Sequence, residues 1–347
     1  MAPVDPAFSA KARNISAVAA VAVVIIHAGS GGMGSFAAKV LHQALGWGIC
    51  TFAVPWFFFA SGYFFAGHLD EKGWWLRALR QRAKTLLLPY LLWNAAFAIF
   101  IVALGMFDNL GVGNPAFAGI RFRGIMWRSL GVDFATHPLL VPFWYIRCLL
   151  IIVALSPALV WALRRWRWYV PLAILPFYLY CCGIQDCHAM PWFFFYSPFS
   201  LAGWLYFSIG VLARIEYRRV WDCRIPTKWL LTVTLSVVAL GRSAIYWRMP
   251  STAGCMWLIG IPLLLLCVWR LVPAHPFPAW LLSLTFPVYA LHFFFEHFLE
   301  TLVFPVAHPS CWAYIFRCAA SLLLAVSSGL LIRTYLPRES RILFGGR

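Results

Sequence analysis

The chain has 347 residues, of which 63% are hydrophobic and only 11% are charged, and its mean hydropathy is +0.78. A soluble domain carries roughly 25% charged residues to solvate its surface, so this composition excludes an ordinary soluble protein. The formal net charge is +17, but the basic residues stand in short clusters between apolar runs. That placement is typical of loops beside a membrane, and we expect membrane lipids, not nucleic acid, as a partner.

About ten apolar segments follow one another, most of them near the length of about 20 residues that crosses a bilayer. In chain order they lie near 15–33, 44–67, 85–107, 139–162, 168–183, 198–213, 229–247, 252–272, 279–300 and 310–332. The fifth and sixth are short, and the boundary between them is the least well marked. The sequence predicts an all-α, polytopic membrane protein with about ten transmembrane helices. We expect 1–347 to form a single membrane-embedded domain with no separate soluble domain.

The loops predict the orientation. When the N-terminus is placed inside, most Lys and Arg fall in cytoplasmic connections, among them 72–84, 164–167 and 214–228, and few fall outside. Basic residues favour cytoplasmic loops, so we expect both termini in the cytoplasm.

Two outer segments leave alternatives open. The segment 117–130 alternates arginines with bulky apolar residues, which fits a helix in the membrane interface or a lid over an outward-facing cavity. The segment 181–188 gathers Cys181, Cys182 and Cys187 with a carboxylate and an imidazole, but its spacing matches no standard zinc pattern. We expect no metal there, and either a periplasmic disulfide or free thiols.

Ionisable residues inside spanning helices are costly and therefore indicate function. His27, Arg147 and His292 lie about 18, 18 and 20 Å from the cytoplasmic side at 1.5 Å per residue, and Glu296 lies near 25 Å. Three helices thus place ionisable groups at a similar depth. The structural alternatives are interhelical hydrogen bonding for the histidines and a counter-ion role for Arg147 beside Glu296.

A histidine at this depth suits proton transfer. Its unperturbed pKa near 6.5 lets an imidazole take a proton from an attacking hydroxyl at neutral pH. A nearby arginine can stabilise the oxyanion of an acyl-transfer intermediate.

Five short motifs in order resemble the acyltransferase-3 family of bacterial membrane O-acyltransferases. They are 16–27 (SAVAAVAVVIIH), 54–63 (VPWFFFASGY), 82–90 (RAKTLLLPY), 143–146 (FWYI) and 286–292 (FPVYALH). The resemblance implies transfer of an acyl group, usually acetyl from cytoplasmic acetyl-CoA, to a hydroxyl of a cell-surface glycan or glycolipid. It also implies a place in the bacterial inner membrane.

The resemblance assigns roles by position. His27 is expected to act as the general base or to accept the acyl group and pass it on, with Arg147 and His292 binding or stabilising in an intramembrane chamber. The expected donor-binding residues are Arg13, Ser16, Arg77, Arg80, Arg82 and Lys84. We call 77–84 the basic turn, and its alternative interpretation is an ordinary cytoplasmic loop. The expected substrate-cavity residues are Ser61, Tyr63, Trp144, Tyr289 and Glu296. For Ser61 the alternative is tight helix packing.

One position departs from the family. The family's arginine eleven positions before the histidine is Ser16 here. Either Arg13, one turn away on a similar helix face, replaces it, or donor binding is weakened.

Two other classes remain as alternatives. One is a transporter or flippase that uses the intramembrane His, Arg and Glu for proton coupling, although the sequence shows no paired halves. The other is a catalytically inactive membrane scaffold, which the Ser16 departure favours. Acyl incorporation separates both from an acyltransferase.

Overall fold

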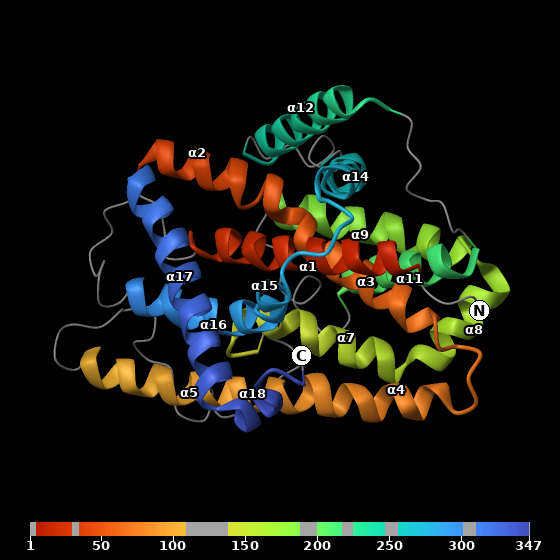
Figure 1. The fold of residues 1–347 in the computed structure, drawn as a ribbon. Helices are drawn as coiled ribbons and strands as arrows, with labels where there is room; N and C mark the ends of the chain where they lie inside the picture. Colours follow the sequence, from red (N-terminus) through yellow and green to blue (C-terminus); the bar gives the residue numbers. More distant parts are fainter. Residues whose placement is uncertain are drawn as a thin grey trace.

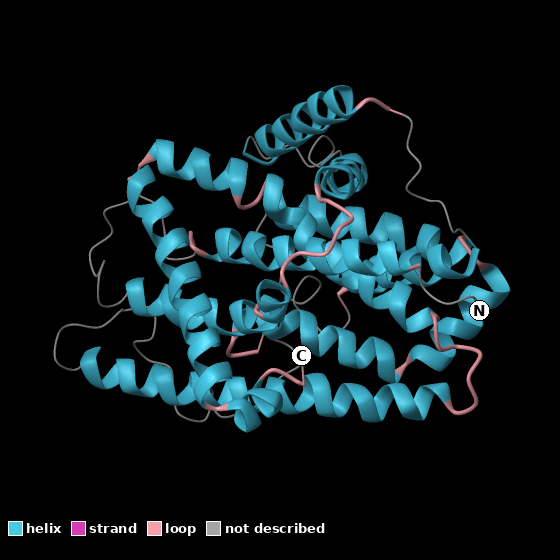
Figure 2. Ribbon diagram, viewed as in Figure 1, coloured by secondary structure: helices cyan, strands magenta, loops and turns pink. Residues whose placement is uncertain are grey.

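The computed structural model describes residues 5–29, 35–108, 138–187, 200–216, 225–246, 256–300 and 310–346. Within these ranges every regular element is a helix and no strand occurs, as Figure 2 shows. The all-α prediction is therefore confirmed for the described part of the chain. The segment 117–130 and the side chains of 181–188, where the sequence left alternatives, lie outside it.

Figure 1 shows the helices, whose bounds are as follows. They are α1 (Pro6–His27), α2 (Phe36–Leu45), η1 (Ile49–Phe52), α3 (Ala53–Ala66), α4 (Trp74–Arg82), η2 (Ala83–Leu87), α5 (Leu88–Asp108), η4 (Val141–Phe143), α7 (Trp144–Ala154), α8 (Ser156–Trp166), α9 (Tyr169–Cys187), α11 (Leu201–Glu216), α12 (Thr227–Tyr246), η5 (Met256–Gly260), α14 (Ile261–Leu271), α15 (Ala279–Ser283), α16 (Thr285–Phe298), α17 (Cys311–Tyr335) and α18 (Pro337–Leu343). The elements η1 and η4 are short 3-10 turns, and η2 and η5 are short π turns. Each leads directly into the next helix.

Among the described residues, 4 helical stretches are long and apolar enough to cross a membrane, or up to 5 if one bent pair counts as a single span. The four are Pro6–His27, Phe36–Ala66, Trp74–Ala103 and Cys311–Tyr335, and the bent pair is Val141–Ala154 with Ser156–Trp166. All of them overlap predicted apolar segments. The other predicted segments also contain helices, which do not meet the same requirement of length and apolar character.

The predicted segment 139–162 is not one straight helix. Its two parts, α7 and α8, meet at a bend of 70° around Leu155. Pro157 stands in the first turn of α8, and its ring lacks an N–H and clashes with the preceding turn. The prediction of an apolar segment is confirmed, whereas the prediction of one straight helix is wrong because this proline breaks it.

Helix α1 occupies the centre of the bundle and packs against α3 and α16. Asn14, which is fully buried, ties its first half to the connection before α15. The Asn14 amide donates to the carbonyls of Pro273 at 3.0 Å and His275 at 2.7 Å, and its Oδ1 accepts from the Phe277 amide at 2.9 Å. This buried polar group is fully satisfied, which fixes α1 relative to the α14–α15 connection.

Helices α3 and α11 approach each other at backbone distance. A methyl group on Gly62 would collide with the carbonyl oxygen of Phe207, and one on Gly210 would collide with that of Phe59. Small residues allow such close packing between membrane helices. The expectation of tight packing at the Ser61–Gly62 pair agrees with this contact.

Several turns with basic residues gather at one end of the molecule, on the right in Figure 1 near the N-terminus. Arg164 pairs with Asp70 at 3.5 Å, which joins the end of α8 to the α3–α4 turn. Arg167 pairs with Glu216 at 3.2 Å, which joins the α8–α9 turn to the end of α11. The α3–α4 turn, the α8–α9 turn and the end of α11, three of the connections that the sequence places on one side of the membrane, therefore lie together.

Candidate active site

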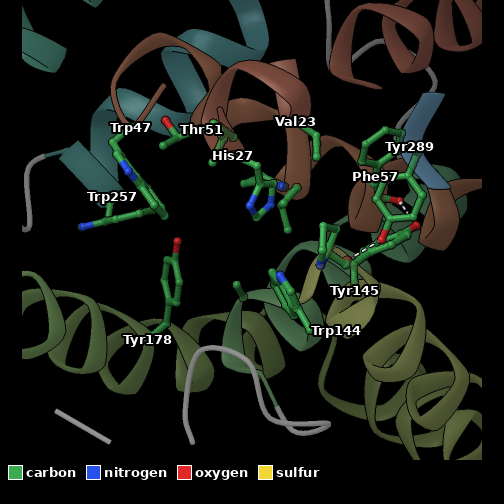
Figure 3. Close-up of a pocket in the computed structure, with 15 residues that line it drawn as sticks. Val23, His27, Trp47, Thr51, Phe57, Trp144, Tyr145, Tyr178, Trp257 and Tyr289 are labelled. Carbon is green, nitrogen blue, oxygen red and sulfur yellow. Dashed lines mark hydrogen bonds between the residues drawn. The ribbon is translucent and has the colours of Figure 1, made fainter. Parts of the chain in front are cut away.

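His27 is the last residue of α1 and faces a cavity of about 80 Å³, which Figure 3 shows. The end of α1 is held in place because two of its final carbonyls have side-chain donors. The Tyr314 hydroxyl donates to the Ile25 carbonyl at 2.9 Å, and His42 Nε2 donates to the Ile26 carbonyl at 3.0 Å. The last carbonyls of a helix otherwise lack partners, so these contacts fix the position of the His27 ring.

Aromatic side chains line most of the His27 cavity. Trp47, Trp144, Tyr178 and Trp257 surround the imidazole in Figure 3. The complete lining is Val23, Ile26, His27, Trp47, Thr51, Val54, Pro55, Phe57, Pro142, Trp144, Tyr145, Tyr178, Ala202, Trp257 and Tyr289. A concave, mostly apolar site with a few polar groups is the usual form of a substrate pocket.

His292 lies directly behind His27. Its side chain is 0% exposed, and the centres of the two imidazole rings are 5.6 Å apart. His292 Nδ1 is 3.1 Å from the Val288 carbonyl, which only accepts, so Nδ1 carries a proton. Its Nε2 has no hydrogen-bond partner among the described residues. Two of the predicted groups of similar depth therefore do meet.

A second cavity, of about 310 Å³, lies further toward the N-terminal end of α1. Ser16 lines it, three turns before His27, which corresponds to about 16 Å along the helix. Ser61 and Arg82 line it as well, and Tyr289 lines both cavities. The cavity that contains Ser16 therefore brings together residues that the sequence assigned to the donor and to the substrate. We call it the Ser16 cavity.

Ser16 is held by two hydrogen bonds. Its hydroxyl donates to the Ala12 carbonyl at 2.9 Å and accepts from Trp56 Nε1 at 3.1 Å. Arg13, the predicted substitute for the family's arginine, is exposed and lines neither of these two cavities. The cation that lines the Ser16 cavity is the half-buried Arg82.

The other expected donor-binding residues of the basic turn do not line either cavity. Arg77 donates to the Glu71 carboxylate and to the Lys72 carbonyl, the latter at 2.9 Å, so it closes its own turn. Arg80 and Lys84 are exposed and line neither cavity.

Arg147 and Glu296 are both buried but do not line either cavity. Arg147 belongs to α7, next to the lining residue Ile146. Glu296 lies one turn beyond His292 on α16. Helix α16 packs against α17, which carries the buried Arg317.

Tyr63 is also buried away from both cavities. Its ring stacks on Phe8 at 4.2 Å between centroids, and its hydroxyl accepts from Arg214 at 3.5 Å. Trp144, by contrast, lines the His27 cavity as expected.

Sequence reasoning missed several lining residues. Phe57 and Tyr145 stand inside two quoted motifs, so the motifs marked their positions but not their roles. Tyr178 and Trp257 carry no signal beyond their aromatic character, because only the packing of α9 and η5 brings them to the cavity. Among the described residues no group of three or more His, Cys, Asp or Glu is arranged to hold a metal ion.

The described helices and the cavity at His27 define a helical membrane protein with an aromatic pocket at a buried histidine. The model of the acyltransferase domain of the acyltransferase-3 family matches residues 15–332, so the chain belongs to this family. Its apolar helices and this family membership make it a multi-pass membrane protein.

One curated relative is the succinoglycan biosynthesis protein ExoH of Rhizobium meliloti (strain 1021). It is 28% identical over 138 residues, which cover 40% of this chain and 36% of that protein. The similarity thus spans little more than a third of the relative's length. No solved structure matches the chain.

Proposed function

We propose that this protein transfers an acyl group, acetyl in the simplest case, from cytoplasmic acyl-CoA to a hydroxyl of a cell-surface polysaccharide or glycolipid. The observation that carries the proposal is the position of His27. This imidazole faces an aromatic cavity, and an adjoining cavity is lined by Arg82 and by Ser16, which precedes His27 by about 16 Å along the same helix. The similarity to ExoH, a succinoglycan biosynthesis protein, supports a polysaccharide acceptor.

The chemistry follows from the site. His27 takes the proton of the acceptor hydroxyl, and the hydroxyl oxygen forms a bond to the thioester carbonyl carbon. The carbon–sulfur bond then breaks, and the departing thiolate takes the proton back from His27. His292 holds the His27 ring from behind. The predicted role of Arg147 in stabilising the oxyanion requires it to act from outside the cavity lining.

The topology that we propose has about ten spans with both termini in the cytoplasm, in the bacterial inner membrane. The shared end of the α3–α4 turn, the α8–α9 turn and the end of α11 supports it. In this orientation the Ser16 cavity opens toward cytoplasmic acyl-CoA, and His27 lies toward an outer acceptor. Membrane lipids surround the bundle, and the proposal needs no metal.

The test is transfer of radiolabelled acetyl from acetyl-CoA to the glycan and glycolipid fractions of membranes that contain the full chain. Membranes without the chain are the control. Covalent label that depends on the chain supports the proposal. A folded protein that labels no acceptor, from acetyl-CoA or from larger donors, contradicts it, and uptake of unmodified substrate would instead indicate a transporter.

A further inference from the structure

Three aromatic residues separate the two cavities. Phe57 of α3, Tyr145 of α7 and Tyr289 of α16 line both of them. Their ring centroids are 5.6 Å apart for Phe57 and Tyr145, and 6.4 Å apart for each of the other two pairs. Each ring therefore contacts the other two, and Figure 3 shows them grouped at one side of the His27 cavity. We call these three residues the aromatic partition.

Hydrogen bonds between helices hold the partition closed. The Tyr145 hydroxyl donates to the Phe57 carbonyl at 3.2 Å and lies 3.0 Å from the Ser61 hydroxyl, which donates to it. The Tyr289 hydroxyl donates to the Pro142 carbonyl. Because both phenolic protons are used in this way, the tyrosines present ring surface rather than donors to anything that passes.

The partition lies between the donor and the base of the proposed reaction. Ser16 and His27 belong to one helix, and the three rings are the residues common to the cavities at these two levels. An acyl group that enters through the Ser16 cavity must pass the rings to reach His27. Side-chain rotation has to open the way.

The volumes on the two sides differ about fourfold, since the Ser16 cavity measures about 310 Å³ and the His27 cavity about 80 Å³. As a scale, an apolar protein cavity of about 150 Å³ admits benzene, which has six heavy atoms. About half that volume suits the three heavy atoms of an acetyl group, whereas a succinyl group has seven. The acceptor hydroxyl must share the same space.

We propose that the aromatic partition of Phe57, Tyr145 and Tyr289 selects the acyl group by size and admits short acyl chains of acetyl size to His27. This inference rests on the proposed acyltransferase function. One added methylene changes discrimination in an apolar site by about 10-fold or more. Butyryl carries two more methylenes than acetyl, so the parent chain should prefer acetyl strongly.

The experiment compares acetyl-CoA with butyryl-CoA as donors in membranes that contain the full chain, with transfer to the glycolipid and polysaccharide fractions measured by mass spectrometry. Phe57→Ala opens the partition, and Phe57→Leu does so with a smaller loss of packing. Phe64→Ala is the matched control, because Phe64 is an aromatic residue of α3 that lines the Ser16 cavity alone.

The preference for acetyl over butyryl should fall by about 10-fold or more in both Phe57 variants and stay at the parent's value in Phe64→Ala. Folded Phe57 variants that transfer acetyl with the parent's preference would overturn the size selection and leave the proposed function intact. A folded parent that transfers no acyl group from either donor would overturn the proposed function, and the size selection with it.

Discussion

The imidazole of His292 lies behind that of His27, with 5.6 Å between the ring centres, and the two residues come from α16 and α1. The Val288 carbonyl fixes the proton of His292 on Nδ1, so its Nε2 is the nitrogen left without a partner among the described residues. His27 is the member of the pair that faces the cavity. In the proposed reaction, His27 therefore transfers the proton and His292 packs against its ring.

Replacement of His27 by alanine should abolish acyl transfer. Loss of a positioned general base costs about 10²–10⁴-fold in rate, and α1 should fold normally because the carbonyls of Ile25 and Ile26 keep their donors. The measurement is label transfer from acetyl-CoA at equal protein abundance. His68→Ala, at an exposed histidine of the α3–α4 turn, is the control and should behave as the parent. Activity of His27→Ala near the parent's would remove His27 from the mechanism.

Replacement of Arg82 by glutamine should weaken donor binding. Arg82 is the cation that lines the Ser16 cavity, and a hydrogen bond to a charged group contributes about 1.5–3 kcal/mol. The KM for acyl-CoA should therefore rise by about 10-fold or more, with a smaller change in kcat. Arg80→Gln is the matched control, since Arg80 lies in the same last turn of α4 but is exposed and lines neither cavity. Equal effects of the two variants would indicate a general electrostatic role of the basic turn.

Replacement of Ser16 by arginine should strengthen donor binding. The new guanidinium would enter the Ser16 cavity and lower the KM for acyl-CoA by about 10-fold, the value of one charge-assisted hydrogen bond. The cost is the hydrogen bond from Trp56, about 1 kcal/mol of stability. Ser16→Ala loses the same bond without gaining charge, so its KM should not fall. An unchanged KM in folded Ser16→Arg would show that the donor phosphates bind elsewhere.

Replacement of Arg317 by methionine should destabilise the bundle. Arg317 pairs with Glu300 at 3.8 Å, and its helix packs against the helix of the buried Glu296. The two carboxylate oxygens of Glu296 have no hydrogen-bond partner among the described residues. Removing one partner of a buried charge pair costs about 3–5 kcal/mol. Thermal unfolding in detergent would measure the loss, with Arg338→Met at an exposed site of α18 as the control. Adding Glu296→Gln and Glu300→Gln should restore part of the stability; a triple variant as unstable as Arg317→Met would rule out the charge explanation.

The sequence predicted which histidines lie at one level of the bundle better than it predicted which side chains face the cavities. His27 and His292 were placed at nearly equal depth from helix rise alone, and their rings are neighbours in the structure. Arg147 was placed at the same depth but lies outside the lining of both cavities. Depth depends on position along one helix, whereas facing depends on how that helix is rotated against its neighbours, which hydropathy does not encode.

The partner of Glu296 illustrates the same limit. The sequence indicates Arg147 as a possible counter-ion because both residues lie in predicted membrane segments. In the structure α16 packs on α17, which carries Arg317, and hydropathy does not predict this contact between helices. Ser16 and Arg82 show the opposite case, since short motifs marked both residues before the structure placed them on one cavity.

The close contact between α3 and α11 at Gly62 and Gly210 determines which motion can open the aromatic partition. Helices that meet at backbone distance cannot move closer together, so we expect α3 and α11 to move little relative to each other. Phe57 then leaves the path by turning its side chain, and rotamer changes occur far faster than the μs–ms displacement of whole helices. Tyr145 and Tyr289 must in addition break interhelical hydrogen bonds, so the lifetimes of those bonds, rather than helix movement, set the frequency at which the two cavities connect.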